Sequence, residues 1–284
     1  MKLSKIFLIF GAVALSALLF TACTEEDDDN PVNGDDPEPP AAPSDIQATV
    51  LDSETIKLRW TASDDENSTN FANYLLTISP GQFQPITIPA GQNTYTVDGL
   101  TEGTVYTFSL ISEGTEDTNS TATEVTWSPA SRFVDTPLDE PIRLYGKSSS
   151  IGSGLAIYDQ AESGPMVYAV SSSNKWNLAF ENESDTELYF GTAGEGVIEY
   201  NWGAGDPSNP AQLGDILIGG NNLDEVYDSQ ALDVGVNYSY AKVNLASDQF
   251  QNADGAILFA RYMVGSNNQY NYGKILVKKI NGSY

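Results

Sequence analysis

The feature that most constrains the fold is an apolar side chain at every second position, a pattern that recurs along much of the chain. In the first example, Ile56, Leu58 and Trp60 alternate with Lys57 and Arg59. Two later stretches share this period, namely Tyr106-Thr107-Phe108-Ser109-Leu110 and Trp176-Asn177-Leu178-Ala179-Phe180. Because successive side chains of a strand point to opposite faces, a period of two indicates half-buried β-strands. The sequence therefore predicts an all-β protein.

In the region after Pro43, strand-like runs follow one another at short intervals and no helical stripe interrupts them. The runs span residues 45–50, 55–60, 74–78, 85–88, 94–97, 104–112 and 123–127. Turn-rich segments separate them at the spacing that is typical of a β-sandwich.

Three features of this region resemble the fibronectin type III family. Trp60 ends the second predicted strand, Tyr74 opens the third, and the segment from Leu100 to Tyr106 has the sequence Leu-Thr-Glu-Gly-Thr-Val-Tyr. The resemblance implies a β-sandwich over residues 44–130. It also implies that the Tyr106 hydroxyl bonds to the backbone near the preceding turn, with Leu100 in the core beneath it. Modules of this family act as spacers or adhesion surfaces, and the chain contains no Arg-Gly-Asp.

The region from Arg132 onward remains strand-like and is richer in Tyr and Gly. Short apolar or alternating runs lie at residues 215–218, 238–245, 257–260 and 275–277, with turn-forming Gly, Asn and Asp residues between them. No repeat of fixed period joins this region to the first, and the compositions differ. The sequence predicts a second all-β domain over residues 131–284, with a boundary near residues 130–141.

Part of the second domain is similar to the HmuY family of Bacteroidetes lipoproteins. The segment 173–180, Ser-Asn-Lys-Trp-Asn-Leu-Ala-Phe, resembles that family's Trp-Asp-x-Ala-Leu/Phe segment, and the glycine-rich stretch 191–196 resembles its Gly-rich loop. The runs 257–261 and 273–277 are similar to its late hairpin, although Asn177 stands where Asp is usual. The resemblance implies a ligand-capturing lipoprotein that works with an outer-membrane transporter.

The characterised members of that family are haemophores whose axial haem ligands are His or Met. This chain has no His, and Met166 and Met263 do not fall at positions that match those ligands. We therefore predict no cofactor. Met166 precedes Tyr168 in a strand-like run and is expected to pack in the core. The alternative is a bis-Met site, which requires Met166 and Met263 to face one another across a cleft.

The N-terminus has the pattern of a bacterial lipoprotein signal. Lys2 and Lys5 precede the apolar run 6–20, which is too short to span a bilayer. The segment Phe20-Thr21-Ala22-Cys23 resembles a lipobox, with Phe where Leu is usual, and implies cleavage after residue 22 and acylation of Cys23, palmitate included. Two or more acyl chains anchor a protein stably. The alternative is an ordinary secretory signal followed by an unrelated cysteine.

Residues 23–43 are expected to form an acidic, proline-rich tether that is too polar to fold. Thr24-Glu25-Glu26-Asp27-Asp28-Asp29 resembles the export signal that places lipoproteins on the outer face of the outer membrane. The alternative is a solvated acidic tail without that role. Both alternatives place the folded part outside the cytoplasm. Cys23 is the only cysteine, so no disulfide forms within the chain.

Charge and composition exclude several classes of function. The chain has 13 Lys and Arg against 39 Asp and Glu, and this acidic balance repels phosphate backbones, so no nucleic-acid partner is predicted. Without His, Ser-His-Asp catalysis and His-bearing zinc sites are absent. The acidic segment Asp64-Asp65-Glu66-Asn67 has the oxygen ligands that Ca²⁺ prefers but lacks the spacing of a known calcium loop. An exposed turn is the favoured interpretation, and no metal site is predicted.

Carboxylates supply the remaining route to catalysis. Glu181, Glu183, Asp185 and Glu187 lie at a spacing of two, and a pair of carboxylates can hydrolyse glycosides. Nothing in the sequence fixes two of them at the required separation, and like charges in a row also protect an exposed strand edge. We favour a protein without enzymatic activity over a carboxylate-based glycoside hydrolase.

Tyrosine, tryptophan and asparagine in the second domain favour a binding role. The candidate ligand-binding residues are Tyr200, Trp202, Tyr270 and Tyr272, because aromatic and amide side chains contact sugars or peptides at low ordering cost. The segment 267–272 is expected to be a loop tip, whereas Tyr238 and Tyr240 are expected to share a buried strand face.

Together these patterns predict a lipid-anchored protein exposed on the bacterial outer membrane. Its C-terminal β domain is expected to bind a small ligand, peptide or glycan without catalysis. The alternative is a structural or adhesive surface protein that has no small-molecule site.

Overall fold

The computed structural model describes residues 38–133, 141–146, 149–193, 197–198, 207–227, 237–264 and 269–278. The predicted leader, Cys23 and nearly all of the tether lie outside these residues, as do Tyr200 and Trp202. Contacts group Pro37–Tyr284 into one compact unit. The architecture within this unit is all-β, as the alternation predicts.

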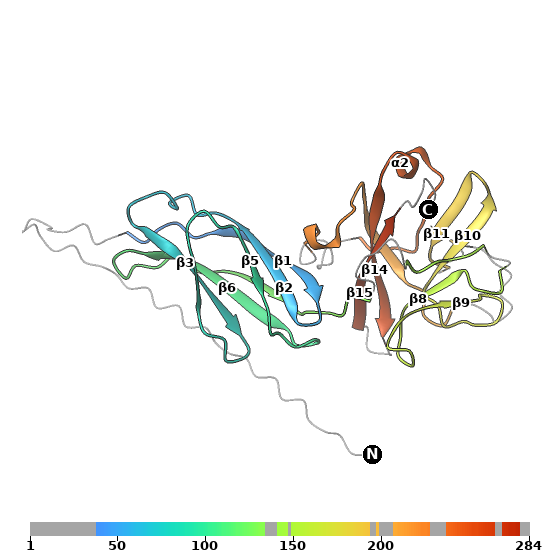
Figure 1. Ribbon diagram of the computed structural model, residues 1–284, viewed down its shortest axis with the longest axis horizontal. Helices are drawn as coiled ribbons and strands as arrows, with labels where there is room; N and C mark the ends of the chain where they lie inside the picture. The colour runs from blue at the N-terminus through green and yellow to red at the C-terminus, as the bar shows by residue number, and fades with distance from the viewer. Residues whose placement is uncertain are drawn as a thin grey trace, which may run out of the picture. The chain divides into compact units, whose positions relative to one another are not determined.

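The first module is a sandwich of two antiparallel sheets (Figure 1). One sheet has the order β1-β2-β5, and the other has the order β4-β3-β6-β7. The strands are β1 (Ser44–Asp52), β2 (Thr55–Thr61), β3 (Phe71–Ser79), β4 (Ile86–Ile88), β5 (Thr94–Val97), β6 (Tyr106–Gly114) and β7 (Thr123–Trp127). Each one contains or overlaps a predicted run.

Alternate side chains of these strands form the core of the first module. Tyr74 and Phe108 are fully buried there, and the Trp60 ring meets the Tyr74 ring edge-on at 5.7 Å between centroids. The Tyr106 hydroxyl accepts a hydrogen bond of 3.1 Å from the backbone N–H of Thr101. Leu100, just before that turn, is buried. The predicted tyrosine corner is therefore confirmed.

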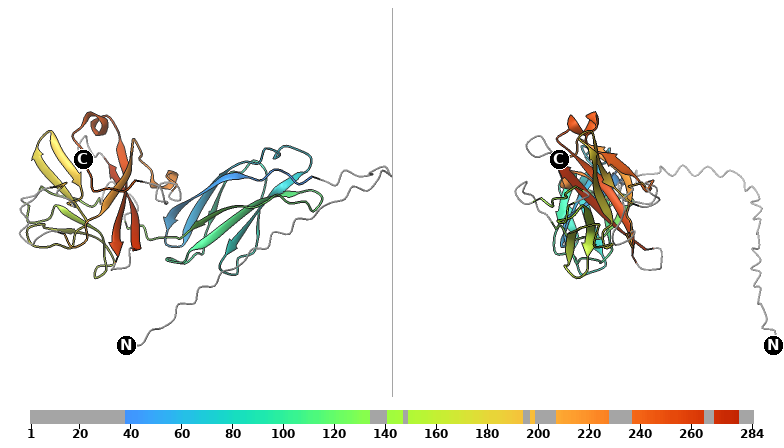
Figure 2. Two further views of the ribbon diagram at one scale, coloured as in Figure 1. Left: turned by 180° about the vertical axis from the view of Figure 1, so that it is seen from behind. Right: turned by 90° about the vertical axis from the view of Figure 1, so that its right-hand side faces the viewer.

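The second module contains two further antiparallel sheets (Figures 1 and 2). A five-stranded sheet has the order β13-β11-β10-β8-β9, and a three-stranded sheet has the order β12-β14-β15. The strands are β8 (Gly154–Asp159), β9 (Gly164–Tyr168), β10 (Leu178–Ser184), β11 (Glu187–Gly191), β12 (Gln212–Ile218), β13 (Lys242–Asn244), β14 (Gly255–Val264) and β15 (Gln269–Lys278). A single-turn helix, α2 (Asp248–Gln251), and a 3₁₀ turn, η2 (Leu223–Glu225), are the helical elements among the described residues.

Strand β14 lies between two apolar clusters. Ala256, Leu258, Ala260 and Tyr262 face the main core of the second module. On the opposite face, Ile257 and Phe259 pack with side chains of the segment 223–226 and with Trp127 of β7. Because both faces are covered over this stretch, its sequence is almost continuously apolar rather than alternating.

The Trp176-Asn177 pair fixes the start of β10. Trp176 is fully buried and donates from Nε1 to the Ser173 carbonyl at 3.0 Å. Asn177 accepts from the Ile157 N–H and donates to the Asn209 carbonyl, each at 2.8 Å. An ionised Asp accepts hydrogen bonds but donates none, so the amide at this position makes a bond that a carboxylate cannot make.

The η2 turn connects the two modules through hydrogen bonds to backbone carbonyl groups. Lys274 of β15 donates from Nζ to the carbonyl oxygens of Leu223 and Val226, at 2.7 and 3.1 Å, and to Thr49 Oγ1 of β1, at 2.9 Å. Thr49, which is fully buried, in turn donates to the Val226 carbonyl at 2.9 Å.

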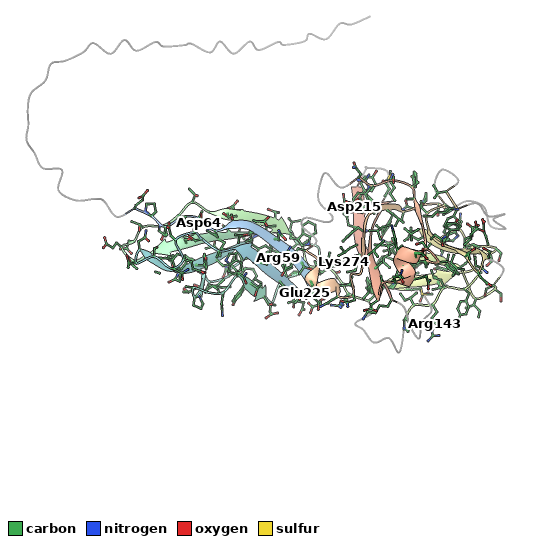
Figure 3. The ribbon with its side chains drawn as sticks, turned by 90° about the horizontal axis from the view of Figure 1, so that it is seen from above. Arg59, Asp64, Arg143, Asp215, Glu225 and Lys274 are labelled. Atoms are coloured by element: carbon green, nitrogen blue, oxygen red, sulfur yellow. The ribbon has the colours of Figure 1, made fainter. Side chains whose placement is uncertain are left out.

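Two ion pairs join the same turn to the first module and to the connecting segment. Lys57 Nζ lies 3.0 Å from the Glu225 carboxylate, and Arg132 lies 2.6 Å from Asp224. The hydrogen bond to Glu225 raises the pKa of Lys57. Figure 3 labels Glu225 and Lys274 at this junction.

Two sequence expectations for the second module are wrong. The run 238–245 forms a strand only at β13, and Tyr238 and Tyr240 are half-buried rather than core residues. Tyr270 and Tyr272 lie in β15 rather than on a loop tip. None of the helices that the structure describes has the length and apolar character needed to cross a bilayer.

Candidate ligand-binding face

The outer end of the β14–β15 hairpin carries an open cluster of aromatic and polar side chains. Arg261 and Met263 follow Phe259 on the face of β14 that points away from the main core. In the antiparallel register, Arg261 pairs with Tyr272 and Met263 pairs with Tyr270. Cross-strand partners share a face, so these four side chains form one surface. The ring of Tyr238 lies beside Arg261 and Tyr272 on this surface. We call Tyr238, Arg261, Tyr270 and Tyr272 the tyrosine–arginine face.

Arg261 is the centre of this face. Its guanidinium carbon lies 4.5 Å from the centroid of the Tyr238 ring and 4.3 Å from that of Tyr270. Its Nε donates a 2.8 Å hydrogen bond to Oε1 of Gln212, its cross-strand partner on β12. Two rings and one amide therefore hold the cation in a single orientation.

The outer layer of the face is accessible to solvent. Tyr272 is 45% exposed and Met263 is 37% exposed, although both are large and largely apolar. The rings of Tyr238 and Tyr272 lie 5.8 Å apart at 60°. Tilted rings with accessible faces can stack against the apolar face of a sugar or another planar ligand.

The tyrosine–arginine face combines the positive charge of Arg261 with the phenol of the half-buried Tyr238. Burial, with a smaller contribution from Tyr272, raises the pKa of Tyr238 to about 12, although the charge of Arg261 opposes this shift. The Tyr238 hydroxyl is buried and has no hydrogen-bond partner among the described residues. The exposed Asp215 of β12 adds a negative charge near Tyr238.

The structure brings together two of the four predicted ligand-binding residues. Tyr270 and Tyr272 join the tyrosine–arginine face, whereas Tyr200 and Trp202 lie outside the described residues. The sequence analysis placed Tyr238 on a buried strand face and did not single out Arg261. Arg261 directly follows the apolar run 257–260. A cation at the end of such a run was the signal available in the sequence.

The acidic segment after β2 uses its carboxylates to hold its own loop. Asp65 Oδ2 accepts from the Ala41 N–H at 2.7 Å, and Glu66 Oε1 accepts from the Tyr74 hydroxyl at 2.9 Å and from the Gly91 N–H at 3.0 Å. Asp64 is exposed and is labelled in Figure 3. Within the described ranges, no group of three or more acidic residues is placed to hold a metal ion.

The row of carboxylates at spacing two is divided by the β10–β11 turn. Glu181 is fully buried, and its Oε2 lies 3.8 Å from Lys242 Nζ, whereas Glu183, Asp185 and Glu187 are exposed. The row therefore does not form one face. The two methionines lie on different sheets, with Met166 half-buried on β9 and Met263 exposed on β14.

A shallow polar hollow of about 160 Å³ lies in the first module. Its lining consists of Glu38, Thr69, Asn70, Thr115, Glu116 and Thr118. The hollow contains no aromatic ring and no cation, so it lacks the mixture of groups found at the tyrosine–arginine face.

Three solved structures are similar to about a third of this chain. A fibronectin type III domain of the human collagen alpha-1(XX) chain is 18% identical, with a TM-score of 0.29, over 34% of this chain and 92% of its own. A computationally redesigned β-sandwich protein is 15% identical, with a TM-score of 0.27, over 31% and 94%. A structure described as a myokine is 14% identical, with a TM-score of 0.27, over 32% and 98%.

No curated protein matches this chain. The model of the fibronectin type III family matches residues 41–126, which contain the sandwich and the tyrosine corner described above. Residues 41–126 of this chain therefore form a fibronectin type III domain, a module of the binding or structural surface type.

Proposed function

We propose that this chain is a non-enzymatic lipoprotein of the bacterial outer-membrane surface, and that its second module binds a glycan through the tyrosine–arginine face. The observation that carries the proposal is the exposure of Tyr272 beside Arg261, whose guanidinium is fixed by two rings and Gln212. Such a surface offers stacking area and hydrogen-bond donors without further ordering of the protein.

The rigidity of the hairpin supports this proposal. Strands β14 and β15 pair along ten residues each without interruption of the register. Side chains that are held on paired strands lose less conformational freedom on binding than side chains on a mobile loop. On the opposite face of the hairpin, Asn271 donates to the hydroxyl of Tyr262, its cross-strand partner, at 3.3 Å, and this bond also holds the two strands together.

The predicted anchor supports the cellular location. The leader, Cys23 and the acidic tether match the arrangement of surface lipoproteins, and a fibronectin type III domain fits the role of a spacer. The HmuY-like segment around Trp176 agrees with a ligand-capturing second module.

The location is tested by growth of a bacterial host with labelled palmitate. We expect label on the wild-type chain and none on Cys23→Ala, which is released from the membrane fraction.

The binding function is tested with the full chain, purified in detergent, on an oligosaccharide array. We expect binding to at least one glycan class and a loss of about tenfold or more for Tyr272→Ala, since stacking and exposed aromatic area are removed. Tyr145→Ala is the matched control, because Tyr145 is 38% exposed elsewhere in the second module. Equal losses for both variants, or no binding to any glycan, would contradict the proposal.

A structural or adhesive role is the second candidate. It is favoured by the fibronectin type III domain itself and by the hydrogen bonds that join Thr49 of this domain to Lys274 and to the Val226 carbonyl next to η2. This candidate predicts that the chain binds no glycan, and that deletion of the gene weakens attachment of the cells to surfaces.

A further inference from the structure

Arg261 differs from the other arginines of the chain in how its charge is satisfied. The chain has four arginines. Arg59 and Arg143 are exposed to water, and Arg132 forms an ion pair with Asp224. Arg261 is half-buried, and among the described residues no carboxylate lies within ion-pair distance of it. This situation is unexpected in a chain that has three times as many acidic as basic residues.

The protein uses only part of the hydrogen-bonding capacity of Arg261. A guanidinium has five N–H donors, and in Arg261 the Nε–H is bonded to Gln212. The two terminal nitrogens donate no hydrogen bond to a described residue. Tyrosine rings stabilise a cation, but they accept no planar pair of hydrogen bonds as a carboxylate does. A partly desolvated arginine at the base of an open face therefore lacks the partner that its geometry fits best.

From this arrangement we infer that the tyrosine–arginine face selects saccharides that bear a carboxylate, which the terminal nitrogens of Arg261 bind while a sugar ring stacks on Tyr272. The inference rests on the proposed glycan binding and names the class of glycan. Uronic acids and sialic acids both supply the carboxylate beside an apolar ring face.

The surrounding charge limits which acidic saccharides fit. The chain has a formal net charge of −26, and Asp215 lies close enough to act on Tyr238. A densely charged polyanion is repelled by this field, whereas one carboxylate gains the local attraction of Arg261. We therefore expect sparsely charged saccharides to bind better than heavily sulfated ones.

The test compares each acid with its own neutral ester on the unmodified full chain. The probes are a galacturonic acid trisaccharide and sialyllactose, each measured by calorimetry as the free acid and as the methyl ester. We expect at least one acid to bind about tenfold more tightly than its ester, because a charge-assisted hydrogen-bond pair is lost on esterification. The two probes distinguish a uronic acid from a sialic acid.

Variants assign the preference to one side chain. Arg261→Gln is expected to bind acid and ester with equal affinity. Arg59→Gln is the matched control, because it removes the same charge from a strand arginine whose Nε also donates to a glutamine, and it should keep the preference. A circular dichroism spectrum equal to that of the wild type confirms that each variant is folded.

The outcomes separate the inference from the proposed function. Equal binding of acid and ester by the wild-type chain, with loss in Tyr272→Ala, overturns the carboxylate preference and leaves glycan binding intact. Absence of binding to every probe and to every arrayed glycan overturns both. A preference that survives in Arg261→Gln also overturns the inference.

Discussion

Arg59 and Arg261 make almost the same contacts in the two modules. Each extends from a strand, and each donates from Nε to Oε1 of a cross-strand glutamine at 2.8 Å, with Gln47 as the partner of Arg59 and Gln212 as the partner of Arg261. A tyrosine ring lies beside each guanidinium, at 4.0 Å for Arg59 and Tyr227. The two sites differ in the order of their layers.

At the first site the arginine is outermost. Arg59 is exposed and covers Tyr227, which is 5% exposed. At the second site the aromatic layer is outermost, because Arg261 is half-buried and Tyr272 is 45% exposed. The same pair of side chains therefore closes a surface in one order and leaves an aromatic surface exposed in the other.

The largest expected effect concerns Lys274, a cation on the same sheet face as Arg261 but with its hydrogen bonds satisfied. Lys274→Met removes the three hydrogen bonds that Nζ donates to the Leu223 carbonyl, the Val226 carbonyl and Thr49 Oγ1. We expect the free energy of unfolding to fall by about 2 to 3 kcal/mol in urea titrations. Lys278→Met on the same strand is the control and should change it by less than about 0.5 kcal/mol. Similar effects for both would show that the carbonyl contacts do not stabilise the junction.

The two arginines themselves give the next effect. Arg261→Gln should lower the free energy of unfolding by about 1 to 2 kcal/mol, because two ring contacts and a hydrogen bond are lost from a half-buried position. Arg59→Gln should lower the free energy of unfolding by only about 0.5 kcal/mol, because water already solvates the exposed Arg59 guanidinium. The reverse order would break the comparison between the two layers.

Tyr238 offers a smaller effect that also tests the buried layer. Burial raises the pKa of Tyr238 to about 12, so folding favours the neutral phenol, and its contribution to stability is present below pH 10 and lost between about pH 10 and 12. The pKa values of Tyr74 and Tyr168 are also raised to about 12, so Tyr238→Phe should reduce, but not abolish, the ultraviolet absorbance change of the folded chain near pH 12. Because the hydroxyl has no partner among the described residues, the free energy of unfolding of this variant at pH 7 should equal that of the wild type or exceed it by up to about 0.5 kcal/mol.

The smallest effect is expected at Asp215. Asp215→Asn removes a negative charge near the tyrosine–arginine face and should tighten binding of a carboxylated saccharide about twofold to threefold at low salt. The gain should disappear when the methyl ester replaces the acid. Asp248→Asn, on the single-turn helix α2, is the matched control for net charge and should leave both affinities unchanged.

The sequence predicted the first module well because its strands follow local patterns. Alternation located β2 and β6 to within two residues, and the Leu100–Tyr106 segment predicted the tyrosine corner. In the second module, β8 and β11 were not predicted. A side chain at Gly154 would overlap the Trp176 ring, and one at Gly191 would overlap Ala241 and Lys242. Such close approaches depend on neighbouring segments and leave no periodic pattern.

The candidate site was only half predictable for a related reason. Tyr270 and Tyr272 were identified from composition, but their asparagine-rich surroundings suggested a loop, whereas pairing with β14 makes them part of a strand. Arg261 and Tyr238 come together only through the register of β12, β14 and β15 and through a segment 23 positions earlier in the chain. No local sequence pattern predicts that Arg261 and Tyr238 lie side by side.

The two-sided burial of β14 has a mechanical consequence. Phe259 packs in the cluster that includes Trp127 of β7, and Arg261 is the next residue on the same face. A load applied at Arg261 would therefore act on the β14–β15 ladder, in which ten residues of each strand are paired without interruption.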